Sequence, residues 1–305
     1  MTAVLSGFAV VLTVVAVGWL VGRSGVLGTS GQVVLARLAF FVGTPALLLH
    51  TLSTADLGAV VSRGLAVTAV AATSSALLFA GVARLLWHQR VEHVVIGALA
   101  SSYVNAANLG IPLAVYVVGD ASVIAPALLF QLAVLAPVAI TVLDARASGA
   151  RRVEWSHLLA PLRNPLLLGS LLGILLAVGH VRLPQQVADP LLLLADTSVP
   201  CALLAFGISL HGGARPHLAG RDLWAATTLK LGVQPVLAWA FGRGVLGLHG
   251  TVLLGVVLAA ALPTAQNVFV YAVRYDRAVP LARDAVLVTT VLSIPVLLVV
   301  AVLLG

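Results

Sequence analysis

The chain has 305 residues, of which 61% are hydrophobic and 9% are charged, with a formal net charge of +7 and a mean hydropathy of +1.11. Soluble domains carry roughly 25% charged residues, so this composition excludes a soluble globular protein. The apolar runs are continuous for about 20 residues, the length of a bilayer-spanning helix, and they lack the alternation of a transmembrane β-barrel. The sequence therefore predicts an all-α polytopic membrane protein.

Ten apolar segments follow one another along the chain, and short loops separate most of them. The fourth and fifth segments are divided only by Gly119 and Asp120. We expect ten membrane spans, at about 3–22, 31–53, 59–83, 92–118, 121–143, 164–180, 188–210, 223–246, 251–274 and 283–304.

Arginines are distributed unequally between alternate loops. With the N-terminus outside, 3 arginines fall on the external side, and 12 fall in cytoplasmic loops. The cytoplasmic set is Arg23, Arg84, Arg90, Arg146, Arg151, Arg152, Arg163, Arg215, Arg221, Arg274, Arg277 and Arg283. Because cytoplasmic loops are enriched in Arg and Lys, this bias predicts a multi-pass protein of the cell membrane with both termini outside. The positive charge then reflects topology, and we expect no nucleic-acid partner.

An internal repeat relates the two halves of the chain. Gly97 matches Gly255, Asn108 matches Gln266, and Pro137 matches Pro295, each at an offset of 158. Each half holds five spans, and an odd number inserts the second copy upside down relative to the first. The sequence therefore predicts two inverted five-helix repeats, residues 1–143 and 164–305, joined by a cytoplasmic loop at 144–163. Inverted repeats of this kind are typical of secondary transporters.

Spans four and nine each carry amides and a proline within an apolar segment. Proline removes a backbone donor and clashes with the preceding turn, so we expect both helices to be broken. Freed backbone groups at membrane depth require polar partners, and amide side chains can serve these groups or a ligand. A proline kink with amides joining neighbouring helices is the alternative interpretation. The candidate substrate-binding residues are Asn105, Asn108, Gly110, Pro112, Pro263, Gln266 and Asn267.

At these residues the sequence resembles the auxin efflux carrier family, which includes bacterial malate and malonate permeases. The span-four stretch NAANLGIPL is similar to the family pattern of Asn, four residues, then Gly-Ile-Pro-Leu, which Asn105 and 110–113 fill. The stretch LPTAQNVFVYAVRYD resembles the family's span-nine pattern around Pro263, Asn267 and Phe269. The similarity in span count and loop placement covers essentially the whole chain.

The resemblance implies a fold like that of bile-acid symporters and sodium/proton antiporters, with broken spans four and nine crossing. Spans 3–5 and 8–10 would form a mobile transport part, and spans 1, 2, 6 and 7 a scaffold that is commonly dimeric. The resemblance also implies an elevator-like movement. It makes Asn105 and Asn267, beside Pro112 and Pro263 as crossover prolines, the leading substrate contacts.

Three charged residues lie within the expected spans. Lys230, which is the only lysine, is a candidate for compensating an anionic substrate or for proton coupling, with snorkelling to the interface as the alternative. Asp196 is a candidate for binding a coupling cation, although we favour a structural ion pair with Arg37. We expect no cofactor and no metal site, and a proton or Na⁺ remains open as the coupling ion.

The leading hypothesis is a secondary transporter of small organic anions, such as a dicarboxylate or an auxin-like carboxylate, with the bilayer as its environment and a homodimer as its assembly. A channel or a receptor-like membrane protein is the second class. An intramembrane enzyme is the third, but no deep His or paired carboxylates accompany the serines, so we expect no enzymatic activity.

Overall fold

The computed structural model describes the chain except for residues 1, 55–62, 148–164, 212–217 and 219. The described residues form helices and connecting turns, with one isolated bridge between two extended residues. The expected all-helical class is therefore confirmed for this part of the chain. Most of the expected connection 144–163, and the beginning of the third expected span, lie outside the described residues.

Several helices have the length and composition of membrane spans. Five described segments are long and apolar enough to cross a bilayer: Gly31–Thr54, Gly64–Leu86, Ala121–Arg146, Gln185–Ile208 and Val279–Leu304. Five shorter apolar helices accompany them: Thr13–Ser24, Val91–Ser102, Ala106–Val118, Pro165–Val178 and Gly250–Ala261. The expected division between the fourth and fifth segments is confirmed, since one helix ends at Val118 and the next begins at Ala121.

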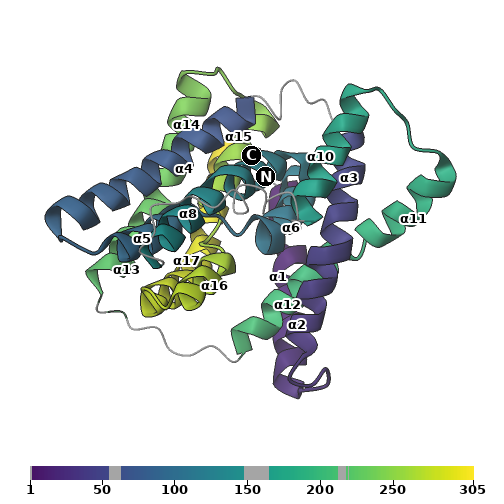
Figure 1. Ribbon diagram of the computed structural model, residues 1–305. Helices are drawn as coiled ribbons and strands as arrows, with labels where there is room; N and C mark the ends of the chain where they lie inside the picture. Colours follow the sequence, from purple (N-terminus) through teal and green to yellow (C-terminus); the bar gives the residue numbers. More distant parts are fainter. Residues whose placement is uncertain (1, 55–62, 148–164, 212–217, 219) are drawn as a thin grey trace.

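The helices pack in two groups, which lie on opposite sides of Figure 1. In the first group, α1 packs on α12, α3 on α10 and α11, and α2 on α12. Its helices are α1 (Thr2–Ser24), α2 (Gly31–Leu38), α3 (Thr44–Thr54), α10 (Pro165–Val178), α11 (Gln185–Ala195) and α12 (Ser198–His211).

The second group is built around α4, α5, α14, α15 and α17, which pack on one another. Its helices are α4 (Gly64–Gly81), α5 (Val91–Ser102), α7 (Ala125–Phe130), α8 (Ala136–Ala147), α13 (Arg221–Thr228), α14 (Gln234–Gly244), α15 (Gly250–Ala261), α16 (Gln266–Tyr275) and α17 (Val279–Leu304). The short helix α6 (Ile111–Leu113) lies where the groups meet and contacts α1 and α12.

Several of the long helices contain a wide, π-type turn. In four cases, at Ala39–Gly43, Ala106–Gly110, Gln131–Leu135 and Leu229–Val233, a proline follows two residues after the turn. Proline cannot donate to the preceding turn and its ring clashes with a carbonyl there. The wider turn gives the proline room, so the helix continues instead of ending.

Small residues let the helices of the first group approach closely. A Cβ atom at Gly207 of α12 would lie 2.2 Å from the carbonyl oxygen of Val15 of α1, and one at Gly18 would lie 2.6 Å from that of Leu204. Close backbone approach of this kind is a main source of helix association in membranes. Lipid tails are as apolar as the side chains, so the hydrophobic effect does not drive helices together there.

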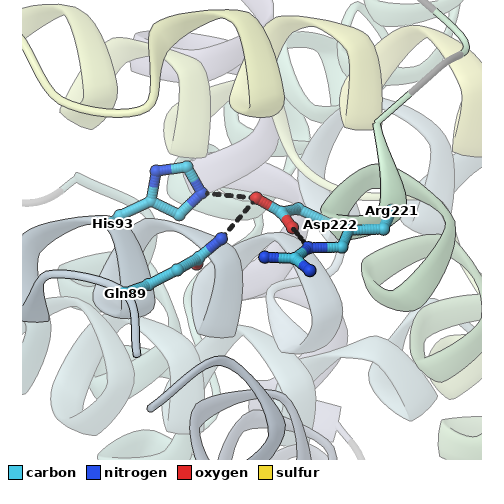
Figure 2. Close-up of polar contacts among 4 residues, drawn as sticks. All are labelled: Gln89, His93, Arg221 and Asp222. Atoms are coloured by element: carbon cyan, nitrogen blue, oxygen red, sulfur yellow. Dashed lines mark hydrogen bonds and ion pairs between the residues drawn. The ribbon is translucent and has the colours of Figure 1, made fainter. Parts of the chain in front are cut away.

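Within the second group, a polar cluster joins the beginning of α5 to the beginning of α13 (Figure 2). Gln89 donates from Nε2 to Asp222 Oδ2 at 2.6 Å, and His93 Nε2 lies 2.9 Å from the same oxygen. Arg221 Nε lies 3.7 Å from Asp222 Oδ1, and the guanidinium is 4.8 Å from the centre of the Trp87 ring. The cluster joins segments about 130 residues apart in the chain.

Large apolar side chains cover much of the outer surface. Leu77, Leu85, Leu193 and Leu303 are between 65% and 74% exposed, and they come from both helix groups. Apolar surface on this scale is unfavourable in water and matches the hydrocarbon of a bilayer.

Candidate functional site

Two helices of the second group are interrupted. The first, α5, ends at Ser102, and helix resumes at Ala106 after the extended residues Tyr103 and Val104. The second, α15, ends at Ala261, and α16 begins at Gln266. In the second case the cause is local, because the residue before a proline is pushed away from helical geometry. Leu262, which precedes Pro263, has φ −59° and ψ 150°.

The two interruptions cross and pair with each other. Val104 and Thr264 face one another as an antiparallel bridge. The Asn105 N–H donates to the Pro263 carbonyl at 2.8 Å, and the Ala265 N–H donates to the Tyr103 carbonyl at 3.0 Å. Each broken helix therefore supplies the backbone partners that the other has lost, which is what membrane depth requires.

The remaining backbone donors at the crossing are held by polar side chains from neighbouring helices. The Val104 N–H donates to Gln131 Oε1 at 3.2 Å, and the Thr264 N–H donates to Thr289 Oγ1 at 3.0 Å. Both acceptors are buried. Gln131 and Thr289 are 158 positions apart, which is the spacing that relates the two halves of the sequence.

Carbonyls at the C-terminal ends of the first half-helices are also satisfied. Thr264 Oγ1 donates to the Ala100 carbonyl at 2.6 Å. Ser75 Oγ donates to the Ser101 carbonyl at 2.7 Å, and Gln234 Nε2 donates to the Ser102 carbonyl at 3.1 Å. These contacts leave few unpaired backbone groups at the end of α5.

Lys230 performs the same task for α15. It is fully buried, and its Nζ donates to the Ala260 carbonyl and to Gln234 Oε1, both at 2.7 Å. A cation at a helix C-terminus interacts favourably with the negative end of the helix dipole. The snorkelling interpretation is therefore wrong, and the side chain does not line the cavity at the crossing.

A small cavity of about 40 Å³ lies beside the crossing. A cavity needs at least about 10–15 Å³ to hold one water, so this one has room for only a few waters. Five of the described residues that line it are amides, and none of them is charged. The lining consists of Phe40, Val104, Asn105, Ala106, Ala107, Asn108, Leu128, Gln131, Leu132, Leu166, Ala265, Gln266 and Asn267.

Asn105 carries an unused donor at this cavity. The residue is 3% exposed, and its Nδ2 has no hydrogen-bond partner among the described residues. A buried polar group without a partner costs about 1–3 kcal/mol, so such a group is a marker of a ligand site.

Two helix beginnings adjoin the same cavity. The second half of the first broken helix begins at Ala106, and α16 begins at Gln266, and both residues line the cavity. The first N–H groups of a helix have no partner within it, and this end carries a partial positive charge. The site thus offers hydrogen-bond donors and positive potential without a cationic side chain, an arrangement suited to a small anion.

The structure brings together four of the predicted residues, Asn105, Asn108, Gln266 and Asn267, around one cavity. Pro263 contributes its carbonyl to the crossing. Gly110 permits a close contact between the two broken segments, because a Cβ there would lie 2.6 Å from Leu262 Cδ1.

Two expectations from the sequence are corrected. Pro112 is not at the crossing, since the first helix breaks at Tyr103–Asn105 and Pro112 lies within the helical stretch that follows. Arg37 and Asp196 are both exposed, and no ion pair within 4.0 Å joins these two described residues. Each lies on an outward-facing part of the first helix group.

Several polar residues at the site were not singled out from the sequence, namely Ser75, Gln131, Gln234, Thr264 and Thr289. Each is a neutral side chain in an apolar segment, which by itself is a weak signal. For Gln131 and Thr289 the 158-residue offset was the usable signal, because it pairs two polar positions in the fifth and tenth segments.

Comparison with known sequences gives a family match and several distant relatives. The family model described as "Membrane transport protein" matches residues 140–301. The "Probable auxin efflux carrier component 5c" of Oryza sativa subsp. japonica is 30% identical over 140 residues, which are 45% of this chain and 38% of the relative. This chain therefore aligns with about two fifths of the length of the plant relatives.

Two microbial relatives align over more of their length. The "Putative malonate transporter" of Rhizobium meliloti is 28% identical over 227 residues, which are 72% of this chain and 69% of the relative. The "Uncharacterized transporter" of Methanothermobacter thermautotrophicus is 25% identical over 291 residues, covering 93% of both chains.

Proposed function

The chain belongs to the membrane transport protein family that includes the auxin efflux carriers, and from this premise we propose that it carries small organic anions across the membrane as a secondary transporter. The family consists of transporters, and the apolar helices are those of an integral membrane protein. The substrate class proposed is a small carboxylate, either a dicarboxylate or an indole-type acid. The names of two relatives, a malonate transporter and an auxin efflux carrier, agree with this class.

The observation that carries the proposal is the cavity at the crossing. It combines five amides, two helix beginnings and the unpartnered Asn105 Nδ2, and none of the described residues that line it is charged. A carboxylate bound there would accept hydrogen bonds from the amides and would lie at the positive ends of two half-helices. A cation would meet the wrong end of both dipoles.

The distribution of the site residues supports an elevator-type movement. The five amides lie on the two broken helices and on the segment after α7, whereas the first group contributes only apolar side chains, Phe40 and Leu166, to the cavity. A substrate held by the second group would therefore travel with it past the first group. The small volume of the cavity is consistent with a closed state from which such a movement starts or ends.

The equivalent tasks of Gln131 and Thr289 support the inverted repeat. Each side chain accepts the N–H of the extended residue at the crossing, from the segment that follows the broken helix. Two copies of one five-helix unit, inserted in opposite directions, would produce this correspondence.

Uptake of radiolabelled malonate and of radiolabelled indole acetate into proteoliposomes tests the function, with and without a proton or Na⁺ gradient. We expect Asn105→Ala and Asn267→Ala to reduce uptake about 10- to 100-fold, because a hydrogen bond to a charged group is worth about 1.5–3 kcal/mol. Gln185→Ala, which removes an exposed amide at the beginning of α11, is the matched control. Carboxylate uptake that is absent, or that both cavity variants leave unchanged, contradicts the proposal.

A further inference from the structure

A second and larger cavity, of about 350 Å³, lies between the two helix groups. This volume falls within the roughly 300–1,000 Å³ of typical small-molecule sites. On one side it is lined by α12, and on the other by α16 and α17. The residues that matter for the argument are Gln32, Phe206, Gln266, Arg283 and Thr290.

This cavity adjoins the site at the crossing. Gln266 lines both cavities. Thr290, on the wall of the larger cavity, follows Thr289, which holds the crossing backbone. A ligand leaving the crossing past Gln266 would therefore enter the larger cavity.

Among the described residues that line the larger cavity, only Arg283 is charged. Its Nε donates to Asp284 Oδ1 at 2.7 Å, and the Asp284 side chain is 4% exposed whereas that of Arg283 is 39% exposed. The carboxylate is thus held inside the protein, and the guanidinium faces the cavity. Because Nε is already engaged, the two Nη groups of the planar guanidinium are the donors directed at a ligand. Together they can form two parallel hydrogen bonds to one carboxylate.

We propose that Arg283 forms a second anion subsite, which binds the carboxylate of the transported substrate between the cytoplasm and the crossing. The inference rests on the proposed transport function. Arg283 belongs to the set of arginines expected on the cytoplasmic side. Asp284 orients the guanidinium, and the neutral Gln266 and Thr290 provide hydrogen bonds without competing charge.

Transport kinetics measured separately from each side test the subsite. Radiolabelled malonate uptake is followed in inside-out and in right-side-out membrane vesicles. In Arg283→Gln, we expect the KM from the cytoplasmic side to rise about 10-fold or more, because a charge-assisted hydrogen bond is lost. The KM from the external side and the maximal rate should stay within about twofold of wild type. Arg283→Lys, which keeps the positive charge but loses the paired donors of the guanidinium, should give an intermediate KM.

The controls separate this role from folding and from the crossing site. Arg283→Gln removes the Arg283 contact of the buried Asp284, so Arg283→Gln/Asp284→Asn is measured beside it and should give the same KM pattern. Arg277→Gln removes an exposed arginine that does not line the cavity and should leave both KM values unchanged.

The possible failures are distinguishable. If Arg283→Gln leaves the cytoplasmic KM unchanged, or raises both KM values equally, the subsite proposal is wrong. In that case, transport that still depends on Asn105 supports the site at the crossing. A wild-type protein that transports no carboxylate overturns both proposals.

Discussion

At the crossing, the role of each polar residue depends on which backbone group its side chain contacts. Lys230 is a charged residue at membrane depth, which by default suggests a function in transport. Its 2.7 Å contact with the Ala260 carbonyl makes it a cap on a broken helix. Asn105 is an ordinary amide in the sequence, yet its Nδ2 is a buried donor that the described residues leave unused.

Thr264→Val tests the value of one such contact. The two side chains have similar shapes, but valine cannot donate to the Ala100 carbonyl, which the threonine hydroxyl reaches at 2.6 Å. We expect a loss of about 1 kcal/mol in the free energy of unfolding, seen as a lower thermal midpoint in detergent micelles. Thr228→Val, at an exposed position of α13, is the control and should change little. Equal midpoints for the two variants would show that the hydroxyl contributes nothing.

At the scale of helices, the sequence predicts where apolar segments lie better than where they break. Their bounds follow from hydropathy, and the break at Leu262–Ala265 follows from Pro263. The other break lies at Tyr103–Asn105, well before Pro112. Pro112 stays helical because the wide turn at Ala106–Gly110 precedes it, whereas Tyr103 and Val104 are extended because they pair with the second crossing segment.

The close packing of α1 on α12 predicts that adding a single methyl group at Gly207 is destabilising. In Gly207→Ala the new Cβ would lie 2.2 Å from the Val15 carbonyl oxygen, so the helices must separate. We expect a loss of about 1–3 kcal/mol, the usual cost of overpacking. Gly81→Ala is the matched control, since nothing lies within 4 Å of its Cβ, and it should be neutral or slightly stabilising. Similar unfolding midpoints for both variants would contradict the close packing.

At the scale of the whole molecule, two helix groups meet along a boundary that holds both cavities. Gln266, Asn267 and Arg283 lie on helices of the second group, and the first group offers mainly apolar surface to both cavities. An apolar surface with few directed contacts suits relative movement, because sliding breaks few hydrogen bonds. The polar cluster around Asp222 lies wholly within the second group and would help that group to move as one body.

The membrane orientation is tested by labelling with a thiol reagent that does not cross membranes. The single cysteine is first removed as Cys201→Ala. We expect Arg182→Cys to react in intact cells and Arg90→Cys to react only after the membrane is permeabilised, since both positions are exposed and are predicted to lie on opposite sides. The reverse pattern would invert the topology and would place Arg283 on the external side.

The sequence by itself determined the helical class, the ranges of the apolar segments, the membrane environment and four of the five amides that line the cavity. These properties follow from local composition and from motifs within single segments. Only the tertiary structure decided which polar groups meet: Gln131 with Val104, Thr264 with Ala100, and Lys230 with Ala260, while no ion pair joins the described residues Arg37 and Asp196. The reason is that the partner of each buried donor comes from another helix, 27 to 164 residues away for the three pairs formed, and helix packing rather than local sequence brings it within hydrogen-bond distance.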